Sequence, residues 1–148
     1  MPQEALGGLN LELSSLIAEG LAGKTLLITG STGFLGKSIV EKLLRSVPEV
    51  GRINLAIRPS QRRSAADRPE TEVLSSPAFK PPREKIGPRA FAALAKEKLA
   101  VVELDLGQEG LGLTEATRGQ VLGADVVIAS AAAVEFDNPA DLSAQTNL

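Results

Sequence analysis

The chain has 148 residues, of which 43% are hydrophobic, and its formal net charge is -2. This is the length of one domain with enough apolar residues for a core, and the charge gives no reason to expect nucleic acid as a partner. The sequence contains no Cys, His or Tyr. Disulfides, thiolate chemistry and thiolate zinc sites are therefore excluded from it, and no metal ligands are assigned.

Residues 1–22 form an N-terminal lead with apolar residues at helical spacing, namely Leu9, Leu13, Leu16, Ile17 and Leu21. We expect a short amphipathic helix that packs on the flank of the domain. The lead is acidic and has neither the basic segment nor the continuous apolar run of a secretory signal. Its polar face lacks Lys and Arg, which disfavours binding to a membrane surface. The sequence thus predicts a cytoplasmic protein without a transmembrane segment.

The rest of the chain is organised around a glycine-rich stretch. Thr25–Thr29 is a short apolar run typical of a buried parallel strand, and glycines follow at positions 30, 33 and 36. Such glycines allow a sharp exit from the strand, close approach to a pyrophosphate and tight packing of the next helix. Free amides around Gly33 to Leu35 would face the anion. The candidate cofactor-binding residues are Gly30, Ser31, Thr32, Gly33, Phe34, Leu35 and Gly36.

A glycine-rich turn that binds nothing is the alternative interpretation of this stretch. The residues after the turn favour a dinucleotide site, because they predict an amphipathic helix that ends near Ser46, before Pro48. Its apolar stripe consists of Leu35, Ile39, Val40, Leu43 and Leu44.

The end of the second strand bears on the choice of cofactor. The segment 52–58 alternates apolar residues and is predicted to be that strand, and no carboxylate occurs from Arg52 to Arg63. An NAD site usually places Asp or Glu there, whereas the 2′-phosphate of NADP needs positive charge. Arg58 stands at the strand end and can bind a phosphate with two parallel hydrogen bonds, so the sequence favours NADP(H). Arg62 and Arg63 are interpreted as surface charges.

The remaining elements complete an α/β pattern. An irregular insertion is expected at about 59–88, followed by a helix over 89–98, strands over 99–104 and 125–130, and a helix from Thr114 to Gly123 between them. Another helix should begin at Asn138-Pro139. We predict that residues 23–148 form a doubly wound parallel sheet of Rossmann type, with local strand order 3-2-1-4 and incomplete after its fourth strand. That strand would leave an apolar edge through which homo-oligomers could form.

Several segments resemble one family of reductases. The GxxGxxG spacing is similar to that of the extended short-chain dehydrogenase/reductase superfamily. Thr-Gly-Ser-Thr-Gly-Phe-Leu-Gly, together with the segments 73–79, 110–114 and 134–139, resembles the N-terminal NADP-binding portion of the fatty acyl-CoA reductases. Thioester-reductase domains of carboxylic acid reductases and peptide synthetases are related to them.

The resemblance implies roles for further residues. Two arginines ten apart bind the 2′-phosphate in the thioester-reductase relatives, and Arg58 and Arg68 match that spacing, although Pro69 departs from the family pattern. Asp105 and Leu106 would contact the adenine, with a turn or helix cap as the alternative role for Asp105. Independently of the resemblance, the small side chains of Ala131, Ala132 and Ala133 at the exit of the fourth predicted strand would leave room for the nicotinamide ribose, with plain packing as their alternative. Asn147 would be a structural anchor.

The activity implied by the resemblance is NADPH-dependent reduction of a fatty acyl-CoA to an aldehyde or alcohol. The family's proton donor is a Tyr followed four residues later by a Lys, and this chain has no Tyr. We therefore expect the chain to be the cofactor-binding part of a longer reductase, with the acyl-CoA bound elsewhere and no catalytic residue among the 148. Three alternatives stay open: a thioester-reductase domain, a nucleotide-sugar epimerase or dehydrogenase, and an inert NADP-binding protein.

Overall fold

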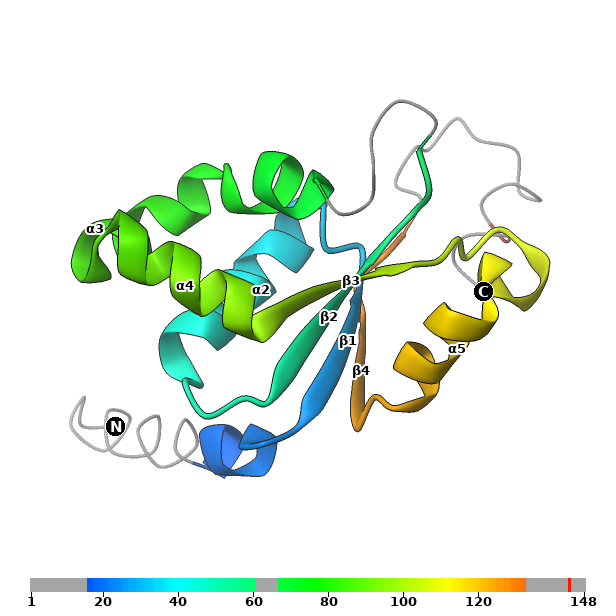
Figure 1. Ribbon diagram of the computed structural model, residues 1–148, viewed down its shortest axis with the longest axis horizontal. Helices are drawn as coiled ribbons and strands as arrows, with labels where there is room; N and C mark the ends of the chain where they lie inside the picture. The colour runs from blue at the N-terminus through cyan, green and yellow to red at the C-terminus, as the bar shows by residue number, and fades with distance from the viewer. Residues whose placement is uncertain (1–15, 61–66, 133–143, 145–148) are drawn as a thin grey trace, which may run out of the picture.

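A four-stranded parallel sheet forms the centre of the computed structural model, which describes residues 16–60, 67–132 and 144 (Figure 1). Its strands are β1 (Thr25–Thr29), β2 (Arg52–Ile57), β3 (Leu99–Glu103) and β4 (Val126–Ala129), and they lie in the order β3-β2-β1-β4. The predicted strand order and the Rossmann-type α/β class are confirmed. The strand order reverses at β1, because β2 and β3 lie on one side of it and β4 lies on the other. The glycine turn directly follows this strand.

The register of the strands places paired residues on the same face of the sheet. Leu26 of β1 pairs with Ile53 of β2 and with Val126 of β4. Asp125 fixes the start of β4, because its carboxylate accepts a hydrogen bond from the Thr25 N–H at 2.8 Å and its own N–H donates to the Thr25 carbonyl at 2.8 Å. These two hydrogen bonds set the register of β4 against β1.

Helices cover both faces of the sheet, as Figure 1 shows. Helices α2 (Phe34–Ser46) and α4 (Pro88–Lys98) lie on one side, and α5 (Glu115–Leu122) lies on the other. Thr114 caps α5 by accepting the Thr117 N–H at 3.2 Å, and the Thr117 hydroxyl accepts the Thr114 N–H in return. The observed bounds of α2, α4 and α5 agree with the predicted bounds to within a residue or two.

Alternate residues of the strands enter two separate cores, because successive side chains point to opposite faces. On the α2 side, the large cluster includes Leu26, Ile28, Val40, Ile53 and Leu55, all fully buried. The α5 side has a smaller cluster of four buried residues, namely Leu27, Ala56, Val102 and Leu104. The predicted stripe of α2 differs at its first member, since Leu35 is 58% exposed at the end of the helix beside the turn.

The expectation of an irregular insertion at 59–88 is wrong for residues 67–88. They form the helical turns η1 (Pro69–Leu74) and η2 (Pro77–Phe79) and the helix α3 (Lys80–Ile86). Proline is tolerated in the first turn of a helix, and each of these elements begins with one there. Val73, Leu74 and Phe79 are buried in the large cluster. Prolines that break periodicity in the sequence instead mark the starts of short elements that complete the core.

The outer strand β4 keeps an uncovered face. Val126 and Ile128 pack toward the large cluster, whereas Val127 is 59% exposed. Leu122 at the end of α5 is 77% exposed. Residues 16–21, just before β1, are helical, and Leu21 packs against the large cluster as the sequence predicts, together with Ala18. The predicted apolar residues Leu16 and Ile17 are instead 62% and 60% exposed. The expected elements over 1–15 and 134–139 lie outside the described residues.

Candidate cofactor-binding site

The carboxyl ends of the four strands gather the predicted site residues along one edge of the sheet. Gly30 follows β1 directly, Arg58 follows β2, Asp105 lies two residues beyond β3, and Ala131 lies two residues beyond β4. In open parallel sheets this edge, at the switch point, is where ligands bind. The structure thus brings together residues from four distant parts of the sequence.

Gly30 meets the first of the three demands predicted for the glycines. Its φ is +68°, a left-handed conformation that side chains disfavour. An added β-carbon would also lie 2.6 Å from the carbonyl oxygen of Ser130 and 2.6 Å from the amide nitrogen of Ala131. The turn after β1 therefore passes directly against the backbone that leaves β4, and only glycine fits there.

The start of α2 presents backbone amides, although not the set that the sequence predicts. The Gly33 N–H donates to the Gly30 carbonyl at 2.9 Å, so it closes the turn and is not free for an anion. Within the described part of the chain, the amides of Phe34, Leu35 and Gly36 have no hydrogen-bond acceptor. No acidic residue occurs in the first turn of α2. The set of free amides is thus shifted by one residue from the expectation, and the start of the helix keeps its positive polarity.

The side chains of the turn do not all face outward. Ser31 is fully buried, and its hydroxyl donates to the carbonyl of Ala56 in β2 at 3.3 Å. Thr32 is half-buried and Gly33 is exposed, while the Phe34 side chain is 89% exposed. Ser31 thus ties the turn to the sheet, and a bound anion would be contacted by backbone rather than by this hydroxyl.

The exit of β4 is joined to the end of β1 by two hydrogen bonds. The Ser130 hydroxyl donates to the Thr29 carbonyl at 2.6 Å, and the Ala131 N–H donates to the Thr29 hydroxyl at 3.3 Å. Ala131 is half-buried and Ala132 is exposed, so small side chains line this part of the edge. The third predicted alanine, Ala133, and Asn147 lie outside the described residues.

The two predicted arginines have different surroundings. Arg58 is exposed, and its guanidinium has no partner among the residues that the structure describes. Arg68 has a side chain that is only 14% exposed, and it forms a two-point ion pair with Glu72, Nε to Oε1 at 3.0 Å and Nη2 to Oε2 at 2.9 Å. Its Nη1 donates to the main-chain carbonyl oxygen of Arg58. Free positive charge at the end of β2 therefore comes from Arg58.

Asp105 occupies a tight turn after β3. Its Oδ1 accepts the N–H of Gly107 at 3.1 Å, and its own N–H donates to the Leu111 carbonyl at 2.8 Å. Leu106 is half-buried and packs on the smaller core cluster. The carboxylate thus caps the turn, as in the alternative interpretation of the sequence, and it is half-buried at the same edge as the glycine turn.

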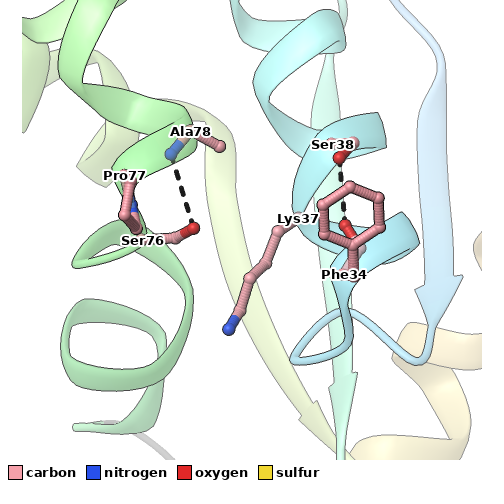
Figure 2. A pocket seen from close by; sticks show the side chains of 6 residues that line it. All are labelled: Phe34, Lys37, Ser38, Ser76, Pro77 and Ala78. Atoms are coloured by element: carbon pink, nitrogen blue, oxygen red, sulfur yellow. Dashed lines mark hydrogen bonds between the residues drawn. The ribbon is translucent and has the colours of Figure 1, made fainter.

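A pocket lies beside the start of α2. It lies between Phe34, Lys37 and Ser38 on the helix and the turn Ser76, Pro77 and Ala78 (Figure 2). Figure 2 shows the Lys37 side chain extending from α2 into the space between the two elements. Lys37 has no ion-pair partner among the described residues, and it adds positive charge next to the free amides.

Sequence reasoning missed three residues that shape this edge. Lys37 could have been found as the cation directly after the third glycine. Thr29 is the polar residue that ends an apolar strand, and Glu72 stands four residues after Arg68, the spacing of a helical ion pair. In the part of the chain that the structure describes, no cluster of three or more His, Cys, Asp or Glu is placed to bind a metal ion. Each helix within those same residues is too short or too polar to cross a bilayer.

A glycine turn at the switch point of a parallel sheet, leading into a helix with free amides, defines a Rossmann-type α/β protein of the nucleotide-binding class. Residues 28–148 match the NAD-binding family described as "Male sterility protein", and the chain belongs to this family.

Its relatives are fatty acyl-CoA reductases. The chain is 36% identical over 137 residues to "Fatty acyl-CoA reductase 1" of Arabidopsis thaliana, which covers 91% of this chain and 28% of that protein. It is 34% identical over 139 residues to "Alcohol-forming fatty acyl-CoA reductase" of Simmondsia chinensis, covering 93% of this chain and 28% of the relative. The chain therefore spans less than a third of these relatives.

Solved structures of reductase domains share the fold. The terminal R domain from the myxalamid PKS-NRPS biosynthetic pathway superposes with a TM-score of 0.65 at 28% identity, over 85% of this chain and 29% of that one. The R domain of a nonribosomal peptide synthetase from Mycobacterium tuberculosis gives 0.55 at 32% identity, over 75% and 25%. The family match supports a nicotinamide cofactor for this chain, and the relatives and solved structures that it resembles are fatty acyl-CoA reductases and reductase domains.

Proposed function

We propose that this chain is the NADPH-binding part of a reductase that converts a fatty acyl-CoA to an aldehyde or alcohol. The observation that carries the proposal is the pairing of free amides at Phe34 to Gly36 with the free guanidinium of Arg58 on one edge of the sheet. The amides fit the pyrophosphate, and the guanidinium fits the additional 2′-phosphate.

The other residues of the edge fit the remaining parts of the cofactor. The half-buried Asp105 and Leu106 would lie against the adenine, and the small side chains at Ala131 and Ala132 would leave room for the nicotinamide ribose. Gly30 and Gly36 let the turn pack directly against the backbone that leaves β4 and against the first turn of α2. Ser31, Thr32, Gly33 and Leu35 belong to this turn as backbone contributors.

When bound, NADPH would supply a hydride to the carbonyl carbon of the thioester, and loss of the thiol would yield the aldehyde. The family's Tyr and Lys would manage the proton, and since this chain has no Tyr, that pair has to lie elsewhere in the enzyme. We infer that the 148 residues alone bind the cofactor without turnover. A cytoplasmic location, as the sequence predicts, is part of this proposal.

A thioester carried by a biosynthetic multienzyme is the second candidate substrate. It is favoured by the fold shared with R domains of peptide-synthetase systems. The fatty acyl-CoA is preferred because the curated relatives, at 34–36% identity, are named as reductases of that substrate.

Fluorescence titration with NADPH and NADH tests the cofactor assignment. We expect NADPH to bind more tightly, and Arg58→Ala to weaken NADPH roughly tenfold or more while leaving NADH unchanged, because one charged contact is removed. Arg52→Ala is the matched control, since Arg52 is also exposed but lies at the opposite end of β2. Equal affinities of the two cofactors for the unmodified chain would contradict the assignment.

A further inference from the structure

Arg68 has little free charge to offer a ligand. Three of its five N–H groups are used: two by the carboxylate of Glu72 and one by the carbonyl oxygen of Arg58. Its side chain is 14% exposed and that of Glu72 is 26% exposed. A phosphate that approached Arg68 would also meet the negative charge of Glu72, so the pair as a whole attracts an anion weakly.

The same contacts hold the main chain of Arg58 in place. The ladder between β2 and β3 ends at Ile57 and Glu103, so the Arg58 carbonyl is the first beyond the paired strand. Arg68 donates to this oxygen, which makes it the partner of a group that the sheet leaves free. Pro59 follows immediately and restricts Arg58 to extended backbone. The peptide after Arg58 is therefore fixed by proline on one side and by Arg68 on the other.

We propose that Arg68 is a positioning residue: Glu72 holds its guanidinium against the Arg58 carbonyl oxygen, and the fixed backbone aims the Arg58 guanidinium at the 2′-phosphate of NADPH. This inference rests on the proposed function and departs from the role that family resemblance implies, in which both arginines contact the phosphate. Glu72 becomes a specificity-determining residue although its own charge repels the ligand.

A double-mutant cycle between Arg58 and Arg68 separates positioning from direct contact. We expect Arg58→Ala to weaken NADPH about 10- to 100-fold and Arg68→Ala about 3- to 10-fold, with NADH affinity unchanged in both variants. If Arg68 acts through Arg58, the variant carrying both substitutions binds NADPH as Arg58→Ala does, within about twofold. A loss in the double variant equal to the product of the two single losses would overturn the proposal, because Arg68 would then contact the phosphate independently.

Variants at Glu72 test the other half of the arrangement. Glu72→Ala should weaken NADPH as much as Arg68→Ala does, and it should have no further effect when Arg68 is already Ala. Glu70→Ala is the control for charge, since Glu70 is exposed on the same helical turn and makes no side-chain contact with Arg68. An affinity that rises above that of Glu70→Ala would show that Glu72 masks a phosphate ligand, and an affinity equal to that of Glu70→Ala would show that Glu72 has no positioning role; either result would overturn the proposal.

Two further measurements keep the outcome clear. Arg68→Lys keeps a charge and a donor but loses the two-point contact with Glu72, so its NADPH affinity should lie between those of the unmodified chain and Arg68→Ala, and it replaces Arg68→Ala if that variant fails to fold. Unchanged NADH affinity shows that the cofactor pocket is intact. If Arg58→Ala itself leaves the preference for NADPH unchanged, the 2′-phosphate assignment fails and takes the positioning role with it. If Arg58→Ala removes the preference but the loss in the double variant equals the product of the two single losses, the positioning role alone fails.

Discussion

Gly36 of α2 lies directly against the backbone of Gly30, the residue that follows β1. A β-carbon at position 36 would overlap the Gly30 carbonyl oxygen and lie 2.7 Å from the Cα atom of Ser31. The first turn of α2 is therefore packed on the turn that precedes it with no space for a methyl group. This contact sets how the free amides of α2 are presented at the edge of the sheet.

Gly36→Ala should destabilise the protein, because the neighbouring atoms are backbone and cannot move aside. We expect the free energy of unfolding to fall by about 1–3 kcal/mol, as in other overpacked sites, despite the better helix propensity of alanine. Gly119→Ala in α5 is the control, since a β-carbon there meets open space, and it should raise stability by about 0.5–1 kcal/mol. Urea unfolding followed by circular dichroism measures both, and equal stabilities would contradict the packing.

Phe79 lies in the helical segment 67–88, for which the sequence predicts an irregular insertion. It is fully buried and its ring lies 6.1 Å from that of Phe91 in α4. Phe79→Ala should cost about 3–5 kcal/mol, the usual cost of truncating a buried aromatic residue. Phe34→Ala removes the same atoms from a side chain that is 89% exposed and should change stability by less than about 0.5 kcal/mol. Similar losses in thermal unfolding would show that η2 is not part of the core.

The predictable part of the fold was the part whose signals are local. The apolar run at β1, the alternating apolar residues at β2, the cap at Thr114 and the glycine pattern at 30, 33 and 36 each determine structure within a few residues. Strand order followed from them because parallel strands joined by helices permit few arrangements. The prediction for the segment 67–88 was wrong because its signals are not local. Its residues Val73, Leu74 and Phe79 have no simple periodicity, and only contact with α2 and α4 shows that they are core residues.

The candidate site shows the same division. Placement of Gly30, Arg58, Asp105 and Ala131 at one edge was predictable from strand ends alone. The hydrogen bonds that distinguish them were not, because they depend on tertiary geometry: Ser31 turns into the sheet, and Arg68 is bound by Glu72. The ion pair of Arg68 with Glu72 did have a sequence signal, because the two residues are four apart. Pro69 between them argued against a helix, and only in a helix does that spacing bring two side chains together.

Gly33→Val should separate binding from folding. Gly33 is exposed at the start of α2 with an ordinary φ of -77°, so a side chain there meets little protein, only the Gly30 carbonyl oxygen at 3.2 Å. The added side chain would occupy the space next to the free amides. We expect both NADPH and NADH to bind roughly tenfold or more weakly, with a small change in melting temperature. Gly20→Val, at an exposed position with nothing within 4 Å, is the control, and unchanged cofactor binding in Gly33→Val would make the turn purely structural.

The uncovered face of β4 predicts self-association of the 148-residue chain. Val127 is 59% exposed on this outer strand, and the strand has no neighbour on its far side among the described residues. Unpaired strand edges with apolar side chains invite pairing with another copy, and a lysine on the edge opposes it. We expect sedimentation velocity to show dimers or larger species that increase with concentration, and Val127→Lys to shift the chain toward monomer. Ile86→Lys, at a 45% exposed apolar position on α3, places the same charge away from β4 and should leave association unchanged. A chain that stays monomeric at every concentration would contradict the role of β4 in association. Equal effects of Val127→Lys and Ile86→Lys would attribute the association to net charge rather than to β4.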